Sequence, residues 1–401
     1  MTAPSLCRWL ITPRTGSDAQ RAPRDVRVDA VRGFALLVIF VTHVPGNPLA
    51  SYAPGAFFFH DAADAFVLLA GFAVALAFGP LFERRGFLVG TARVGGRILE
   101  LYGAHLLTFI FVAGLIAWAA MRFDDPLYYE AVNIQPLFAE TERALLHALL
   151  LVYQPNYLDI LPLYVVLLAA FPLLPFAMRA SPAAVLCGSV LLWALAQGTG
   201  LNLPNLPLNG VWFFNPLAWQ LLFVIGAVAG YAVRDGVALP RGRTLLAIAL
   251  LAVPGIVLLK AMQGHVPLLG FLEWLPREYH LPWDKVRLSP ARIFSLLACA
   301  YLIAVLVDRD AAWLHRAPAR TLAIVGRHSL EVFSIGIVCS MVAYVVLTET
   351  DRVWYAVLGV NAVGIVTLVL LAHVLAWYDR TVSQAKAVSA PASTVTAGVP
   401  S

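Results

Sequence analysis

Three ionisable side chains lie along the first long apolar segment of the chain, in the sequence RVDAVRGFALLVIFVTH. They are Asp29, Arg32 and His43. At about 100° per residue in a helix, Arg32 and His43 point in nearly the same direction, and Asp29 has the i,i+3 spacing from Arg32 at which an ion pair can form. Ionisable groups inside a membrane segment are costly and usually functional. We therefore expect this stripe to face protein or water, although Asp29 and Arg32 would equally suit an interfacial pair that caps the helix.

His43 is the member of this stripe best suited to catalysis. It opens the sequence HVPGNPL, in which the prolines and the glycine stop the helix and expose backbone groups and the amide of Asn47. A neutral imidazole at the mouth of a membrane segment can accept a proton from a hydroxyl, as a general base does. The alternative is a histidine that is merely satisfied at the outer interface.

A second polar motif, FHDAADAFVLLAG, begins the next apolar segment. Asp61 is a suitable N-cap, because a helix N-terminus favours acidic groups, and this role explains Asp61 better than Asp64. Asp64 lies three residues later, inside the helix and on the same face. One of the two carboxylates could hold the His43 ring in its useful tautomer, as carboxylates do in hydrolytic triads.

Two later segments carry candidate binding residues. In QPNYLDILPLY, two prolines bracket Asn156 and Asp159, and irregular backbone at membrane depth is tolerated where it lines a cavity. In WDKVRLSPARIF, Lys285, Arg287 and Arg292 are basic residues that suit recognition of a carboxylate or a phosphate. An ordinary loop and a solvated charged loop explain these two segments about equally well. A further motif, WFFNPLAWQ, is typical of the aromatic belt at a membrane interface, although its Asn215 and Gln220 could line a polar cavity.

Several enzyme classes lack their motifs in this sequence. No HExxH, GxSxG, Walker or GxGxxG pattern occurs in a suitable context, so metalloprotease, serine hydrolase, ATPase and dehydrogenase functions have no support. The four cysteines form no CxxC pair, and we therefore expect neither a zinc site nor a disulfide framework. The net charge of +5 is spread over short loops without a basic stripe, which argues against a nucleic-acid partner.

The elements that position these residues are membrane helices. The chain is 401 residues long, 60% hydrophobic and 13% charged, whereas soluble domains carry about a quarter charged residues. We predict an all-α polytopic integral membrane protein of about ten transmembrane helices, since apolar runs long enough to cross a bilayer occur throughout. These runs cover residues 29–45, 62–80, 97–119, 160–178, 183–199, 213–233, 243–262, 291–307, 328–349 and 353–377.

The basic residues predict the orientation of these helices. Arginines and lysines concentrate before the first run, in every even-numbered loop and in the tail, which the positive-inside rule assigns to the cytoplasm. Both termini are therefore expected there, and the longer, aromatic loops outside. We divide the chain into a cytoplasmic segment (1–28), a transmembrane domain (29–379) and a disordered tail (380–401), with a half-helix or interfacial segment at 143–153.

The segment RDVRVDAVRGFALLVIFVTHVPGNPL, continuing to FFFHDAADAFVLLAGF, resembles the start of the OpgC-type family of glucan succinyltransferases. The resemblance continues through YQPNYLDILPLY, FNPLAWQLLFVIG, the K-x-R-x-S-P-x-R pattern at 285–292 and GRHSLEVF. It implies transfer of an acyl group, succinyl or acetyl, from a cytoplasmic acyl-CoA to a sugar hydroxyl of a periplasmic or surface glycan. It also implies the bacterial inner membrane, and it matches His43 to the essential histidine, Arg32 to the helix arginine and Asp29 to its acidic neighbour.

A function of another class fits the same residues. A charge-rich membrane segment is also expected in a transporter or flippase for an anionic or saccharide solute. The absence of an internal repeat argues mildly against common transporter folds. A purely structural scaffold would not explain so many ionisable groups at membrane depth. Consumption of acyl-CoA with labelling of a glycan would distinguish an acyltransferase from a transporter.

Overall fold

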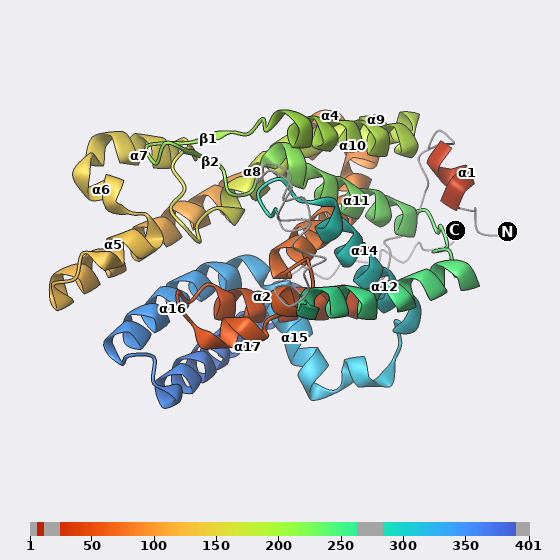
Figure 1. Ribbon diagram of the computed structural model, residues 1–401. Coiled ribbons are helices and arrows are strands. Elements are labelled where there is room, and N and C mark those ends of the chain that lie inside the picture. The colour runs from red at the N-terminus through yellow and green to blue at the C-terminus, as the bar shows by residue number, and fades with distance from the viewer. Residues whose placement is uncertain (1–5, 12–24, 263–283, 390–401) are drawn as a thin grey trace, which may run out of the picture.

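The computed structural model describes residues 6–11, 25–262 and 284–389, and this part of the chain is almost entirely helical (Figure 1). The described residues contain one pair of strands, β1 (Pro204–Asn205) and β2 (Gly210–Val211), which run antiparallel. The prediction of an all-α multi-pass membrane protein is confirmed, because seven described helical segments are long and apolar enough to cross a membrane. They are α4 (Ala62–Phe123), α8 with α9 (Ile160–Ala170 and Leu174–Ala180), α10 (Pro182–Thr199), α11 (Pro216–Arg234), α12 (Arg243–Met262), α16 (Ser329–Glu349) and α17 (Trp354–Ser389).

Three of the ten predicted apolar runs have no helix of their own among these seven segments, and they also form helices. The first run lies in α2 (Val26–Thr42) and the eighth in α14 (Pro290–Leu306), each 17 residues long. The second and third runs both lie in α4, which continues for 62 residues. A straight helix of that length would extend about 90 Å, three times the thickness of the hydrocarbon core. The backbone leaves the helical conformation at Gly86, where φ is 80° and ψ is 179°.

Two pairs of helices cross at very short distance through glycines. A Cβ atom on Gly33 of α2 would lie 1.9 Å from the carbonyl oxygen of Leu322, in α15 (Ala317–Arg327). On the other side of the same crossing, a Cβ on Gly326 would lie 2.0 Å from the carbonyl oxygen of Asp29. Gly71 of α4 and Gly226 of α11 make an equivalent crossing. Small residues let membrane helices approach until their backbones touch, so these crossings fix α2 and α4 within the bundle.

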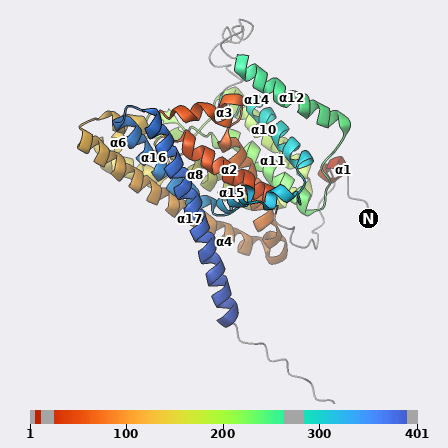
Figure 2. The ribbon, with the colours of Figure 1, turned by 90° about the horizontal axis from the view of Figure 1, so that it is seen from below.

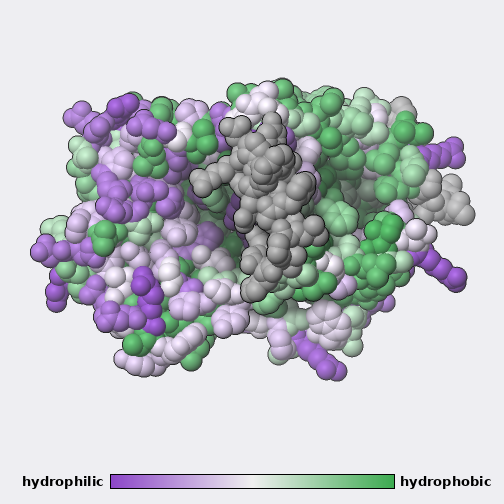
Figure 3. All heavy atoms as spheres, viewed as in Figure 1, coloured by the Kyte–Doolittle hydropathy of each residue, from purple (hydrophilic) through white to green (hydrophobic). Residues whose placement is uncertain are grey.

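Short helices and the strand pair gather at one end of the molecule, and α1 (Leu6–Ile11) lies at the other (Figures 1 and 2). At the first end are α5 (Leu127–Val132), α6 (Gln135–Ala139) and α7 (Thr141–Leu149). Helix α7 overlaps the short segment predicted at 143–153, but it begins two residues earlier and ends four residues before residue 153. Figure 3 shows hydrophilic residues collected over this end and hydrophobic residues over the region of α9 and α10. The polarity therefore changes along the direction in which most of the long helices run.

The prediction that disorder begins at residue 380 is wrong for the residues that the structure describes there. Helix α17 continues to Ser389 and projects beyond the rest of the bundle (Figure 2). Side chains of this extension bond to the preceding turn, because Arg380 Nε donates to Ala376 O at 2.9 Å and Thr381 Oγ1 to Trp377 O at 3.0 Å. The remainder of the predicted tail, 390–401, lies outside the described residues.

Candidate functional site

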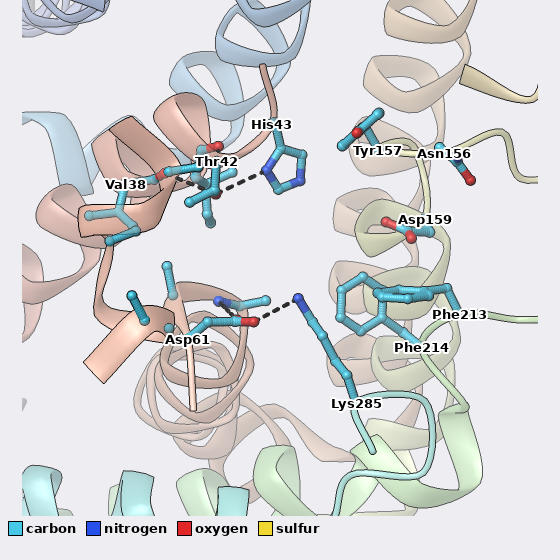
Figure 4. A pocket seen from close by; sticks show the side chains of 17 residues that line it. Val38, Thr42, His43, Asp61, Asn156, Tyr157, Asp159, Phe213, Phe214 and Lys285 are labelled. Carbon is cyan, nitrogen blue, oxygen red and sulfur yellow. Dashed lines mark hydrogen bonds and ion pairs between the residues drawn. The ribbon is translucent and has the colours of Figure 1, made fainter. Parts of the chain in front are cut away.

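A cavity of about 430 Å³ lies where the ends of several helices and loops meet (Figure 4). Its walls come from the end of α2, from α3 (Pro54–Phe57), from the start of α4 and from the segments that precede α8, α11 and α14. Segments separated by more than two hundred residues thus contribute to one space. The polar lining residues and the aromatic residues beside them are Thr42, His43, Asp61, Asn156, Tyr157, Asp159, Phe213, Phe214 and Lys285.

His43 enters this cavity because α2 ends at the preceding residue. Its backbone N–H donates to Ile39 O at 2.9 Å and closes the last turn, and Gly46 then reverses the chain with φ of 71°. The imidazole lies beside the ring of Tyr157, with 5.4 Å between the ring centroids. Its Nδ1 is 3.5 Å from the hydroxyl oxygen of Thr42. The side chain best suited to proton transfer therefore faces an open, partly polar space.

Asp61 and Asp64 form a reciprocal cap at the start of α4, which confirms Asp61 as the N-cap. Asp61 Oδ1 accepts from the backbone N–H of Ala63 at 2.9 Å, and Asp64 Oδ2 accepts from the backbone N–H of Asp61 at 2.8 Å. Asp61 reaches the cavity, whereas Asp64 is completely buried behind it. In the described part of the protein, neither carboxylate hydrogen-bonds His43. The expectation that one of them orients the imidazole is therefore wrong for this structure, since both are occupied elsewhere.

The partners of the two carboxylates are the basic residues of the turn before α14. Arg292, itself buried, pairs with Asp61 Oδ2 at 3.0 Å and with Asp64 Oδ2 at 2.5 Å. Lys285 Nζ is 2.7 Å from Asp61 Oδ2. Burial alone would raise the pKa of Asp61, but Lys285 and Arg292 hold it well below its usual range. The four charges compensate one another, and this offsets the cost of burying Asp64 and Arg292, while Asp61 and Lys285 remain partly exposed to the cavity.

Lys285 is held with its ammonium group in the cavity. The indole N–H of Trp219 donates to the backbone carbonyl oxygen of Lys285 at 2.9 Å. The ammonium nitrogen is 5.5 and 5.3 Å from the ring centroids of Phe213 and Phe214, within the range of cation–π attraction. The motif WFFNPLAWQ, attributed above to an interfacial belt, therefore also builds one wall of the cavity. The motif lines the cavity through Phe213 and Phe214, and not through Asn215 and Gln220 as the sequence suggested. The sequence does not single out the two phenylalanines, because a pair of phenylalanines at a membrane interface has many structural uses.

The segment that carries Asn156, Tyr157 and Asp159 is anchored on both sides. Asn205 Oδ1 accepts from Gln154 N at 2.9 Å, and Asn205 Nδ2 donates to Gln154 O at 3.0 Å. The side chain of Asn156 accepts from the Asn133 amide at 3.0 Å. Tyr157 adopts φ of 71°, a conformation that is unusual for an aromatic residue.

Asp159 lines the cavity without a compensating ion pair among the described residues. Its side chain is nearly buried, with 8% of the residue exposed. Burial raises the pKa of Asp159 to about 6, although the nearby charge of Lys285 partly opposes this effect. A carboxyl with a pKa near 6 can accept a hydrogen bond from a bound hydroxyl when it is ionised, or donate one to the hydroxyl when it is protonated.

Six of the predicted site residues lie away from the cavity lining: Asp29, Arg32, Asn47, Asp64, Arg287 and Arg292. Asp64 and Arg292 lie behind it and support Asp61. Asn47 is buried and donates to Val41 O and Asn361 Oδ1, both at 2.9 Å. Asp29 pairs with Arg327 at 3.5 Å, and Arg32 donates to Ser329 Oγ at 2.9 Å. Arg32 lies about 16 Å from His43 along the helix axis, so this pair belongs to the other end of α2.

Arg287 and His60 lie near the cavity but outside its lining. Arg287 is half-buried, lies 3.7 Å from Asp284 in an ion pair and does not line the cavity. His60, which precedes Asp61, was not singled out from the sequence. Its Nδ1 is 2.7 Å from Ser295 Oγ, and burial lowers the pKa of His60 to about 4, so this imidazole is neutral at physiological pH. Trp283, the first residue of the predicted WDKVRLSPARIF motif, lies outside the described residues.

Comparison with known proteins gives one match. The family model described as OpgC protein matches residues 24–380, which include every helix that contributes to the cavity. No curated protein matches the chain, and no solved structure does.

Proposed function

Because this chain belongs to the OpgC protein family, we propose that it is a membrane O-acyltransferase that transfers an acyl group to a sugar hydroxyl of a glucan. One observation supports this proposal most strongly. The imidazole of His43 shares a cavity with two carboxylates, an amide, an ammonium group and three aromatic rings. Carboxylates and amides bind sugar hydroxyls, and a neutral imidazole among them is placed to accept a hydroxyl proton.

The proposed reaction is acyl transfer from a thioester, with His43 as the general base. The sugar hydroxyl oxygen attacks the acyl carbonyl carbon while its proton moves to the imidazole. The tetrahedral intermediate then collapses, the carbon–sulfur bond breaks, and the thiolate of coenzyme A leaves and takes up the proton. Lys285, with one ammonium hydrogen on Asp61, has further hydrogens for an anionic group in the cavity.

We assign binding roles to the polar residues around His43. Asp61, Asn156 and Asp159 would hold hydroxyls of the acceptor sugar, and Phe213 would cover its apolar face. Lys285 would recognise the free carboxylate of a succinyl group. Asp64 and Arg292 would support Asp61 from behind, while Asn47 and Arg287 would fix the adjacent turns. Asp29 and Arg32 would face an acyl-CoA donor at the cytoplasmic end of α2.

We further propose that the protein crosses the bacterial inner membrane about ten times, with both termini in the cytoplasm. The helical state of all ten apolar runs supports this count, since α2, α14 and the two parts of α4 complete the set. The concentration of basic residues in the even-numbered loops supports the orientation. The cavity would then open toward the periplasm, where the glucan acceptor is.

The test is glycan analysis of cells that lack the gene and are complemented with variants. Mass spectrometry of periplasmic and surface carbohydrate should show an acyl mass with the wild-type protein and none with His43→Ala. His315→Ala is the matched control, because His315 is exposed and lies far from the cavity in sequence and structure. The control should restore the acyl mass fully. Wild-type acylation by His43→Ala, at equal protein level, would refute the role of His43.

The mass of the transferred group tests the finer assignment. A succinyl mass supports carboxylate recognition by Lys285, and an acetyl mass contradicts it. Unchanged glycans in all strains would favour the second candidate, a transporter or flippase for a saccharide or anionic solute. The charges of Asp61, Asp64 and Arg292 in and behind the cavity would suit that function too. Uptake of labelled oligosaccharide by proteoliposomes would then be the decisive measurement.

A further inference from the structure

We propose that Thr42 and Tyr157 are positioning residues for His43: Thr42 keeps the proton of the imidazole on Nδ1, and Tyr157 holds the ring so that Nε2 faces the cavity. This inference rests on the proposed function, in which His43 is the base. It gives the roles to a hydroxyl and an aromatic ring, where the sequence suggested a carboxylate. Figure 4 shows Thr42 and Tyr157 on opposite sides of the imidazole.

The role of Thr42 follows from where its hydroxyl proton goes. Thr42 Oγ1 donates to the backbone carbonyl oxygens of Val38 and Ile39, at 3.0 and 3.2 Å. This bond to the preceding turn is common for threonine in membrane helices. The hydroxyl has a single hydrogen, so toward the imidazole the oxygen presents only lone pairs. A nitrogen at 3.5 Å from that oxygen can therefore interact favourably only as N–H.

This arrangement determines which nitrogen is the base. In a neutral imidazole one nitrogen carries the hydrogen and the other has a free lone pair. When Nδ1–H points to Thr42, Nε2 keeps the lone pair. The carbonyl oxygen of Ile39 is a further hydrogen-bonding neighbour of the His43 ring, and like the Thr42 oxygen it can only accept. Both neighbours belong to the last turn of α2, and we infer that Nε2 is left for a substrate hydroxyl. A contact of 3.5 Å is long for a hydrogen bond, and catalytic hydrogen bonds of this kind shorten when substrate is bound.

Tyr157 restricts the rotation of the same ring. The two rings are 5.4 Å apart between centroids and inclined by 59°. Tyr157 cannot move away easily, because Asn156 N donates to Val132 O at 2.9 Å and so ties the loop to α5. Within the loop, Leu158 N donates to Pro155 O at 3.2 Å and closes a turn around Tyr157. Its φ of 71° is a strained conformation, and such strain is retained mainly where the surroundings impose it. The aromatic ring is thus a fixed wall for the imidazole.

Two pairs of variants separate these roles from general effects on folding. Thr42→Val removes the acceptor oxygen at nearly constant volume, and Thr42→Ser keeps it. Tyr157→Ala removes the ring, and Tyr157→Phe keeps it. We expect the first member of each pair to lower kcat roughly 10- to 100-fold with little change in KM, because the base is misplaced while substrate still binds. The second member should retain most of the wild-type kcat. An equal loss in both members of a pair would overturn the role of that residue.

A spectroscopic measurement makes the test independent of the proposed function. In protein labelled with ¹⁵N-histidine in detergent, the His43 signals are assigned by their loss in His43→Ala. We expect the Nδ1–H form in the wild type and Thr42→Ser, and a mixture of tautomers in Thr42→Val. An Nε2–H form in the wild type would overturn the inference, even if His43 proved essential for acyl transfer. The expected tautomers without any acyl transfer would uphold the positioning of His43 and refute only the proposed reaction.

Discussion

At the scale of single residues, the site combines compensated and uncompensated charges. Asp61 and Asp64 share Arg292, and Lys285 balances the second negative charge, so buried and half-buried groups of opposite sign stabilise one another. Asp159 differs, because it is nearly buried and has no ion pair in the described part of the chain. Residues that are kept for function often cost stability in this way.

Asp159→Asn should therefore make the protein more stable at neutral pH. The pKa of Asp159 is raised to about 6 in the folded protein, from an ordinary value of 3.8, so the folded state binds its proton more tightly than the unfolded state does. Its contribution favours folding at low pH and is lost as the pH rises through about 6. Thermal unfolding in detergent should show a higher Tm than wild type at pH 7.5, by the equivalent of at most about 3 kcal/mol.

A control for this prediction is the Tm difference between Asp159→Asn and wild type at low pH. Near pH 4 the Tm difference should nearly vanish, because the wild-type carboxyl is then protonated in the folded protein. Asp310→Asn is the matched variant, since Asp310 lies in an exposed loop, and it should leave Tm unchanged at both values of pH. A Tm for Asp159→Asn below that of wild type at pH 7.5 would contradict the argument. It would show that the carboxylate form is stabilised in the native protein.

At the scale of elements, the position of the site depends on how closely α2 and α15 approach each other. His43 lies at the end of α2, and the glycine crossing at Gly33 and Gly326 fixes that helix two to three turns away. No side chain can be accommodated there, because the nearest atoms belong to the backbone of the other helix. A shift of α2 would move the imidazole relative to Tyr157 and Asp61, which belong to other elements.

Gly33→Ala should consequently destabilise the protein and lower its activity together. The added methyl group would lie 1.9 Å from the carbonyl oxygen of Leu322, so the helices must separate. Overpacking of this kind costs roughly 1–3 kcal/mol or more. Gly359→Ala on α17 is the control, because its Cβ would meet no atom within 4 Å and alanine favours the helix. Equal melting temperatures for the two variants would show that the crossing tolerates a side chain.

At the scale of the whole molecule, polarity and charge define two ends. The end with α5, α6, α7 and the strand pair is hydrophilic and lies opposite α1. The cavity is built from segments that the charge pattern assigns to the outer side, whereas Arg32 and Arg327 lie near the end that it assigns to the cytoplasm. Helix α2 runs from the Asp29 and Arg32 region to the cavity, with polar groups at both of its termini.

Reporter fusions should establish this orientation. Fusions at Arg85 and Pro240 are expected to be cytoplasmic, and fusions near residues 130 and 275 periplasmic, because the first two lie in the basic loops. Alkaline phosphatase should be active only at the latter positions and a fluorescent reporter only at the former. A reversal at a single position would change the number of membrane crossings. A reversal at all four would place the cavity on the cytoplasmic side.

The sequence by itself determined the properties that depend on local composition and spacing. Apolar runs of sufficient length require lipid and backbone bonds within each segment, so the all-α membrane class and the positions of the helices followed directly. The cap at Asp61 and the end of α2 at HVPGNPL were also predictable, because they involve residues a few positions apart. The sequence did not reveal that the second and third apolar runs belong to one helix, α4, which is interrupted only at Gly86. Glycine permits the non-helical backbone angles found there but does not require them.

Only the tertiary structure decided which polar groups meet. Either Asp61 or Asp64 was expected to hold the His43 ring, yet Arg292, more than two hundred residues later, pairs with both of them. The phenylalanines at 213 and 214, the loop with Tyr157 and the ammonium of Lys285 close around the imidazole from three other segments. Helix period fixes the direction of a side chain relative to its own helix, but the rotation and depth of each helix depend on packing against its neighbours. Contacts such as the backbone approach at Gly33 set that packing, and they are not encoded in any one segment.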